Sequence, residues 1–281
     1  MPRIRSLFLA GFALGTTACA PAVPWQVTTE TVWHGNVTNA ERSADVLPAL
    51  QGRTELHGTL FSRALENGHR LRVTAGGLAE IWPRFGGLNR FATHFAAGWE
   101  YKPWLGPYRP VIAAETEGEW TLAQEPVRGG FGGVGRLSVR QRAGAAWLLS
   151  AGHEWWRFDA RGKAFDRTAH EWFGRVEWSA GADWSVAVEG RERMGDVVSY
   201  SRPPRPDIEA IGKPITYVDT FEQDVPWIAY YFRARTRSGA VEVLRLVGRT
   251  SLMLRHEYRL TLHAGPGYKN HLTTLRLAIP F

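Results

Sequence analysis

Three histidine–glutamate pairs come closest to the spacing of a known catalytic motif. They are His153-Glu154, His170-Glu171 and His256-Glu257. A zinc-protease motif needs a second histidine four residues after the first, so that both ligands lie on one face of a helix. The required positions hold Arg157, Gly174 and Leu260 instead. We therefore expect no metal site from these residues.

A glycine-rich segment has the spacing of a dinucleotide-binding fingerprint. Gly130, Gly132 and Gly135 spell GxGxxG. Such a site needs a helix directly after the glycines, because the pyrophosphate binds at the helix N-terminus. Residues 136–140 alternate between polar and apolar side chains instead, which is typical of a strand. We predict a glycine-rich turn followed by a strand, and no cofactor.

Charged side chains recur at every second position in several segments. Spacing of this kind places a series of charges on one face of a strand. We expect these faces to line the interior of a barrel, with the acidic residues on one wall and many arginines on the wall made by the last strands. The predicted lumen charges are Glu100, Glu115, Glu117, Glu119, Arg136, Arg140, Arg233, Arg235, Arg237, Arg255, Glu257, Arg259 and Arg276.

The elements that would position these charges are strands, because apolar residues recur with a period of two. In residues 91–101 the odd positions are mostly aromatic or aliphatic and the even positions are polar or small, and residues 252–262 repeat the split. We predict an all-β, transmembrane, antiparallel up-and-down barrel of about twelve strands. The predicted ranges are 26–38, 51–64, 69–82, 90–104, 109–122, 132–143, 146–160, 166–180, 183–200, 221–247, 250–263 and 269–281.

The connections between these strands alternate in length. One set is short and glycine-rich, including residues 66–68, 144–145, 181–182 and 248–249. The other set holds the long stretches, residues 39–50 and the proline-rich residues 201–220. Short periplasmic turns opposite longer outer loops are typical of bacterial barrels. This asymmetry predicts that the chain starts on the periplasmic side.

The N-terminus has the order of an export signal. Arg3 and Arg5 precede an apolar run from Leu7 to Leu14, which is too short to span a bilayer, and small residues follow. We expect residues 1–20 to be removed and residues 21–281 to form the barrel. Cys19, the single cysteine, would leave with the signal or carry a lipid, so no disulfide is expected.

Composition supports a membrane barrel over other classes. Lys and Arg outnumber Asp and Glu by 34 to 27, but the arginines are spread singly along alternating segments, so nucleic acid is not an expected partner. Tryptophan is amphipathic and favours headgroup depth. A soluble sandwich is the alternative, but its strands seldom keep one whole face charged. The predicted interface aromatics are Trp82, Trp99, Trp104, Trp147, Trp178, Trp184 and Trp227.

The C-terminus carries a resemblance to a known class. Leu275, Leu277, Ile279 and Phe281 alternate and end on a terminal phenylalanine. This resembles the C-terminal sorting signal of Gram-negative outer-membrane β-barrel proteins. The resemblance implies location in the outer membrane, contact with its lipids and recognition by the barrel assembly machinery. Pro280 departs from the pattern, because proline cannot donate to the ladder. The end is also loosely similar to the barrel domains of surface-lipoprotein assembly modifiers.

Three functions follow from this architecture. The leading hypothesis is a small porin-like channel, not an enzyme, which passes small polar or anionic solutes drawn by the late-strand arginines. A second is a plugged, non-conducting barrel that acts as an anchor or assembly partner, since buried charges must pair. A third is a lipid-directed hydrolase built on His256, which falls on the apolar face; it would lose ester hydrolysis when His256 is replaced.

Overall fold

The computed structural model describes residues 25–104, 106–221, 226–263 and 267–281, and nearly all of its regular structure is strand. The predicted signal peptide, Cys19 included, lies outside the described residues. No helix in the described ranges is long and apolar enough to cross a bilayer. The elements are β1 (Trp25–His34), β2 (Ala49–Ala64), β3 (His69–Ile81), β4 (Arg90–Tyr101), β5 (Val111–Ala123), β6 (Gly130–Ala143), β7 (Trp147–Ala160), β8 (Arg167–Ala180), β9 (Trp184–Ser201), α1 (Pro206–Glu209), β10 (Ile215–Val218), β11 (Trp227–Val247), β12 (Thr250–Leu262) and β13 (Gly267–Pro280).

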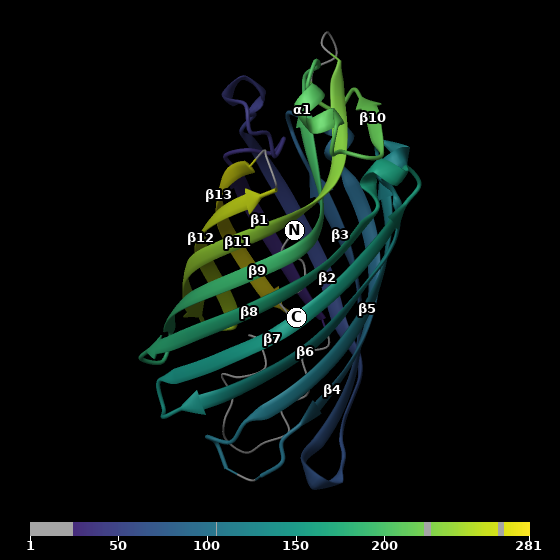
Figure 1. The fold of residues 1–281 in the computed structure, drawn as a ribbon. Coiled ribbons are helices and arrows are strands. Elements are labelled where there is room, and N and C mark those ends of the chain that lie inside the picture. Colours follow the sequence, from purple (N-terminus) through teal and green to yellow (C-terminus); the bar gives the residue numbers. More distant parts are fainter. Residues whose placement is uncertain (1–24, 105, 222–225, 264–266) are drawn as a thin grey trace.

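The strands form one closed antiparallel barrel (Figure 1). Neighbours in sequence pair with each other, β9 pairs with β11, and β13 returns to pair with β1, where Val27 lies opposite Ile279. Of the thirteen strands in the sheet, β10 pairs with β11 outside the ring, so twelve strands close the barrel. The predicted fold class and strand number are therefore confirmed.

Alternation along each strand separates a lipid-facing surface from the lumen. On β12, Leu252 and Leu254 are exposed on the outside, whereas Arg255 and Glu257 are buried inside. The strands form because each one can place apolar side chains toward lipid while its charged side chains find partners in the interior. The same sequence pattern could not satisfy both environments as a helix.

The two ends of the barrel differ as predicted. Tight turns at Gly144, Gly181 and Gly248 join strands at one end, and all three glycines have positive φ values of 83°, 82° and 62° that side chains disfavour. β1 begins and β13 ends on this turn side. There the Phe281 amide donates to the Trp25 carbonyl at 3.0 Å. The long connections, with α1 and β10, lie at the opposite, loop-side end (Figure 1).

Some element boundaries differ from the prediction. The first strand ends at His34, because the next residues turn away: Asn36 bonds to Ala40 and to residues of β13. The proline-rich stretch 201–220, predicted as a long connection, contains α1 and β10. The predicted strand 221–247 begins at Trp227, and residues 222–225 are not described.

An apolar core lies at the loop-side mouth, and we call it the lid. It joins the β3–β4 connection to the top of β9, which lies six strand steps from β3 in either direction around the ring, and to the top of its neighbour β11. Contacts between opposite walls must cross the mouth. Its aromatic members pack edge to face or tilted, with ring centres 5.2 Å apart for Phe85–Phe221 and 5.3 Å for Phe221–Trp227. The buried members are Ala49, Trp82, Phe85, Phe165, Val198, Tyr200, Val218, Phe221, Trp227 and Ala229.

The predicted position of two interface aromatics is wrong, because both lie in the lid. Trp82 and Trp227 were expected at headgroup depth, but they are 8% and 0% exposed inside the lid. Both rings contact other side chains of the mouth. The ring centres of Trp82 and His34 are 4.8 Å apart, and the Trp227 ring packs against the Phe221 ring. Their positions at strand ends gave no sign that the loops fold inward over them.

Candidate functional site

The lumen gathers most of the charges predicted to line it. Ten of the predicted residues lie on the inward face of their strands, where the alternation of buried and exposed side chains places them. They are Glu100, Glu115, Glu117, Glu119, Arg136, Arg140, Arg255, Glu257, Arg259 and Arg276. Near the turn side, Arg140 donates to Glu100 at 2.8 Å.

The prediction that Arg233, Arg235 and Arg237 point into the lumen is wrong. Arg237 lies opposite Leu260 on β12 and Glu192 on β9, and all these positions face outward. The guanidinium side chains of the three arginines are 77%, 48% and 58% exposed. Thr236 and Ser238, at the alternate positions of β11, face the lumen instead.

The acids and arginines are also not divided between two walls. They alternate along a chain of ion pairs, which we call the belt. Arg136 lies 2.7 Å from Glu154, and Arg191 lies 3.8 Å from Glu154 and 2.6 Å from Glu189. Pairing replaces the predicted segregation because a charge buried in a narrow lumen is costly without a partner.

The belt continues across the late strands. Glu189 accepts from Arg255 at 3.2 Å, Arg255 also pairs with Glu257 at 2.9 Å, and Glu257 accepts from Arg259 at 2.7 Å. At the other end, Glu115 lies 4.0 Å from Arg136 and 3.6 Å from Arg72. The belt therefore runs over strands from both sides of the barrel.

Sequence analysis missed several belt members. Glu154, Glu171, Glu189 and Arg191 lie inward on β7, β8 and β9. A second group joins β1, β2 and β13, where Arg53 lies 2.5 Å from Glu55 and 3.6 Å from Glu30. Alternation with the exposed apolar neighbours could have identified them, because inward and outward positions alternate along these stretches of strand. In β2 the register shift lies beyond Glu55, between Thr59 and Phe61.

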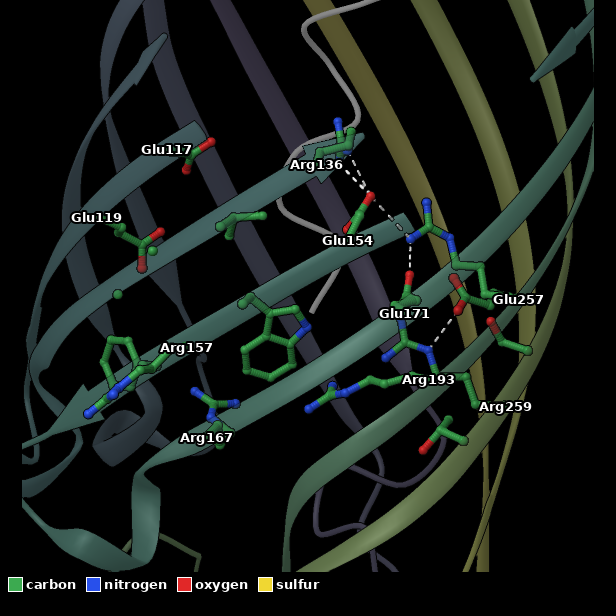
Figure 2. A pocket seen from close by; sticks show the side chains of 18 residues that line it. Glu117, Glu119, Arg136, Glu154, Arg157, Arg167, Glu171, Arg193, Glu257 and Arg259 are labelled. Atoms are coloured by element: carbon green, nitrogen blue, oxygen red, sulfur yellow. Dashed lines mark hydrogen bonds and ion pairs between the residues drawn. The ribbon is translucent and has the colours of Figure 1, made fainter. Parts of the chain in front are cut away.

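On the loop side of the belt the lumen holds a cavity, which we call the upper hollow; Figure 2 shows the side chains that line it. About 1070 Å³ in this region is not filled by protein atoms. Trp156 on β7 lies between two arginines, with its ring centre 4.0 Å from the Arg193 guanidinium and 5.9 Å from that of Arg167. Cation–π contact with the indole helps to keep both guanidinium groups at the surface of the hollow.

Arginines and glutamates both line the upper hollow. Glu117 and Glu119 lie on β5, whereas Arg167, Arg193 and Arg259 lie on later strands together with Glu171 and Glu257 (Figure 2). Arg193 donates through Nη2 to the Asp196 carbonyl at 2.8 Å, and its buried Nε has no hydrogen-bond partner among the described residues. This arrangement offers donors to an anion entering the hollow.

A lower hollow lies on the turn side of the belt. Its space is about 630 Å³, and it is lined by β2, β3, β4 and β5. Arg70, Arg72, Glu100 and Glu115 supply its charges, and Thr59 and Ser62 supply hydroxyl groups. Glu115 also belongs to the belt, so the belt separates the two hollows.

Arg128, in the β5–β6 connection, fastens the lid. It donates to the Tyr200 hydroxyl at 2.7 Å, to Thr220 at 3.1 Å and to Glu125 at 2.6 Å, and it lies 4.5 Å from the centre of the Phe165 ring. Burial alone would lower the pKa of the Arg128 guanidinium, but Tyr200 and Glu125 outweigh burial and raise it. Arg128 is therefore a fixed positive charge at the mouth.

The outer face holds the remaining predicted residues. Trp147, Trp178 and Trp184 are exposed near the turn side, as is Trp104 in the β4–β5 connection, and the Trp99 indole donates to His69 at 3.1 Å. Leu275, Leu277, Ile279 and Phe281 are exposed along the outside of β13 and the terminus. Within the described residues, no group of three or more metal-binding side chains is found.

His256, the candidate for hydrolysis, lies on the outer face. Its Nδ1 is 3.1 Å from the Thr273 hydroxyl, and its ring centre is 5.8 Å from that of His271. A nucleophilic hydroxyl would need a base that is itself oriented by a third group, usually a carboxylate. The contacts found here satisfy two polar side chains in an apolar surface and supply no such carboxylate.

A solved structure of another protein shares this fold. No protein-family model and no curated protein matches the sequence. A solved outer-membrane channel from Pseudomonas putida F1 is similar, with 12% identity, a TM-score of 0.56, and coverage of 95% of this chain and 99% of that one. The NanC porin has 8% identity and a TM-score of 0.47, covering 91% and 100%. An anion-selective porin from Comamonas acidovorans has 9% identity and a TM-score of 0.42, covering 92% and 98%. The first match shows a shared barrel fold.

Proposed function

We propose that this chain is an outer-membrane channel that passes small polar or anionic solutes, and that its loop-side mouth is covered by the lid in the conformation described. The observation that carries the proposal is the group of Arg167, Arg193 and Arg259 that lines the upper hollow, the first two of which stack on Trp156. Guanidinium groups recognise carboxylates and phosphates through paired donors. The barrel fold, similar to that of an outer-membrane channel, supports the proposed location and activity.

The belt would act as the selective constriction. An anion in the upper hollow exchanges water for the guanidinium groups, while Glu117 and Glu119 disfavour a second negative charge. Passage toward the lower hollow then requires side chains of the belt to exchange partners. Because Arg136, Arg191 and Arg255 each have at least two carboxylate neighbours, an exchange of partners at these arginines keeps each charge compensated.

Planar-bilayer recording tests this function. The purified protein is placed between solutions of unequal KCl concentration, and the reversal potential gives the ratio of anion to cation permeability. We expect Arg193→Gln combined with Arg259→Gln to lower anion preference, because two of the arginines that line the upper hollow lose their charge. Arg237→Gln is the matched control, since it removes an arginine from the outer face. Equal selectivity in both variants would argue against the proposal.

A second candidate function is a non-conducting barrel that anchors or assembles a partner. The lid and the belt both favour it, because each one crosses the lumen. The two candidates differ in what happens when the lid is opened: a channel conducts, whereas a barrel sealed by the belt stays silent. Conductance of variants with an opened lid therefore separates the two functions.

A further inference from the structure

Three arginines project from the outer wall of the barrel at its loop-side rim. Arg233, Arg235 and Arg237 occupy alternate positions of β11 and form what we call the arginine rim. Arg235 lies opposite Leu262, the last residue of β12, so the group marks the upper edge of the barrel wall. Their high exposure means that they contact the surroundings of the barrel and not its lumen.

The same face of β11 gives their depth in the membrane. Below the arginine rim the outward residues include Val241 and Val243, and then Arg245, whose guanidinium lies 5.1 Å from the Trp184 ring at the turn side. Arg237 and Arg245 are eight residues apart, which corresponds to about 20 Å along the barrel axis at a rise of about 3.4 Å and a tilt of about 40°. An apolar band is about 25 Å tall. Arg237 therefore lies near the upper edge of the band, and Arg233 and Arg235 lie at headgroup depth.

The surroundings combine positive charge with apolar contact. Arg235 is flanked across the sheet by Met194 and Leu262, and Arg237 by Leu260, all on the outer face. Glu192 pairs with Arg235 at 2.5 Å and with Arg237 at 3.0 Å, and Asp196, which is itself buried, lies 3.8 Å from Arg233. Lys269, opposite Leu260 on β13, adds a further exposed cation. Positive charges thus exceed the negative ones in contact with them.

We propose that the arginine rim binds the phosphate groups of a phosphorylated lipid in the outer leaflet, with the lipid's acyl chains against Met194, Leu260 and Leu262. A soluble anion would gain the charge but not the apolar contact, whereas a phospholipid or phosphorylated glycolipid gains both. Arginine binds phosphate through paired donors, and cations at a membrane surface each contribute measurably to lipid attraction. This inference does not depend on whether the barrel conducts.

The test uses the detergent-purified full barrel and bisphosphorylated lipid A as the probe. Binding is followed by native mass spectrometry, with the same lipid after removal of both phosphates as the comparison ligand and inorganic phosphate as a competitor. We expect the phosphorylated lipid to bind, the dephosphorylated lipid to bind at least about tenfold more weakly, and inorganic phosphate to compete poorly. Equal binding of the two lipids would overturn the proposal, and strong competition by inorganic phosphate would show a simple anion site instead.

Variants place the site on β11. Replacing all three arginines with glutamine should weaken lipid A binding at least about tenfold, whereas Arg245→Gln, on the same face at the opposite rim, should leave it unchanged. Glu192→Gln should strengthen binding, because it removes the carboxylate that competes for Arg235 and Arg237. The Glu192→Gln result tests the site independently if the triple variant fails to fold. Unchanged binding in Glu192→Gln, or equal losses in the triple variant and Arg245→Gln, would refute the assignment.

Discussion

Arg255 on β12 reaches past β11 to Glu189 on β9, with Nη2 3.2 Å from the carboxylate. The same guanidinium lies 2.9 Å from Glu257 and 3.5 Å from Glu242. One arginine therefore compensates three carboxylates from three strands. Because β9, β11 and β12 are neighbours in the ring and are joined by these ion pairs as well as by the sheet, the belt braces this wall on its lumen side.

Replacing Arg255 should destabilise the barrel strongly. Arg255→Gln leaves Glu189, Glu242 and Glu257 with less compensation in a buried site, where breaking an ion pair costs about 3 kcal/mol or more. We expect the free energy of unfolding in detergent, measured by guanidinium titration of tryptophan fluorescence, to fall by that amount. Arg245→Gln is the control, because this exposed arginine should contribute within about 0.5 kcal/mol. Similar losses in both variants would show that the belt has no special role.

Opening the lid should raise conductance. Phe85→Ala combined with Phe221→Ala removes two rings whose centres lie 5.2 Å apart and which join opposite sides of the mouth. Loss of a buried phenylalanine costs about 3 kcal/mol or more, which is enough to open a local contact without unfolding a barrel. We expect more frequent or larger channel openings in planar bilayers. Phe95→Ala, on the lipid-facing side of β4, should leave the recordings unchanged. Silence of the lid variant would favour the non-conducting barrel.

The strands were largely predictable because one physical rule governs them. Lipid outside and charge inside impose a period of two along every strand, so the predicted range 69–82 differs from β3 by one residue and 250–263 from β12 by one residue. The turn and loop ends were predictable for a related reason, since tight turns need glycine at positive φ. Neither inference required knowledge of which side chains touch.

The arginine rim shows where the same rule was applied incompletely. Arg233, Arg235 and Arg237 share the parity of Val241 and Val243, which face lipid, so alternation alone places them outside. Charge indicates an inward side chain only within the apolar band, because at headgroup depth an outward arginine is solvated and stable. Near the rim of a barrel, the alternation of positions along a strand is therefore a better guide than charge to whether a side chain faces the lumen or the outside.

Other features could not be predicted from local sequence. The Arg255–Glu189 contact skips a strand, so it depends on the stagger of the strands around the ring, which alternation does not specify. The lid joins Phe85 to Phe221 over a long sequence separation, within connections that have no periodicity to interpret. Both are properties of the closed barrel and not of any one strand.

Acid should loosen the segment around α1. The Arg205 guanidinium hydrogen-bonds to Asp207 at 2.7 Å and lowers the pKa of that carboxyl from 3.8 to about 2. A lowered pKa means that the ionised carboxylate stabilises the folded segment above about pH 4, and that this contribution is lost as the pH falls toward 2. Because the pair is partly exposed, its worth is a few tenths of a kcal/mol, or about a twofold change in local opening.

Hydrogen exchange can measure that change. Amides of residues 208–212 should exchange about twofold faster in Asp207→Asn than in the unmodified protein at pH 6, and at equal rates at pH 2. Glu209→Gln, in the same helix, controls for the loss of one negative charge and should leave the difference between the two pH values unaltered. A pH-independent difference in Asp207→Asn would mean that the Arg205 contact is not the cause.

The terminal phenylalanine should matter for assembly more than for stability. The Phe281 amide closes the seam with Trp25, but its exposed ring lies at the end of β13, where it buries little surface. We therefore expect Phe281→Ser to lower the amount of heat-modifiable, folded barrel in outer membranes of an expressing bacterium, while purified protein refolds in detergent as well as before. Ala278→Ser, an inward position on the same strand, is the control for a general effect of serine in β13. If Phe281→Ser impaired refolding and assembly equally, the side chain would be structural, and the outward apolar series ending at Phe281 would not act as a sorting signal.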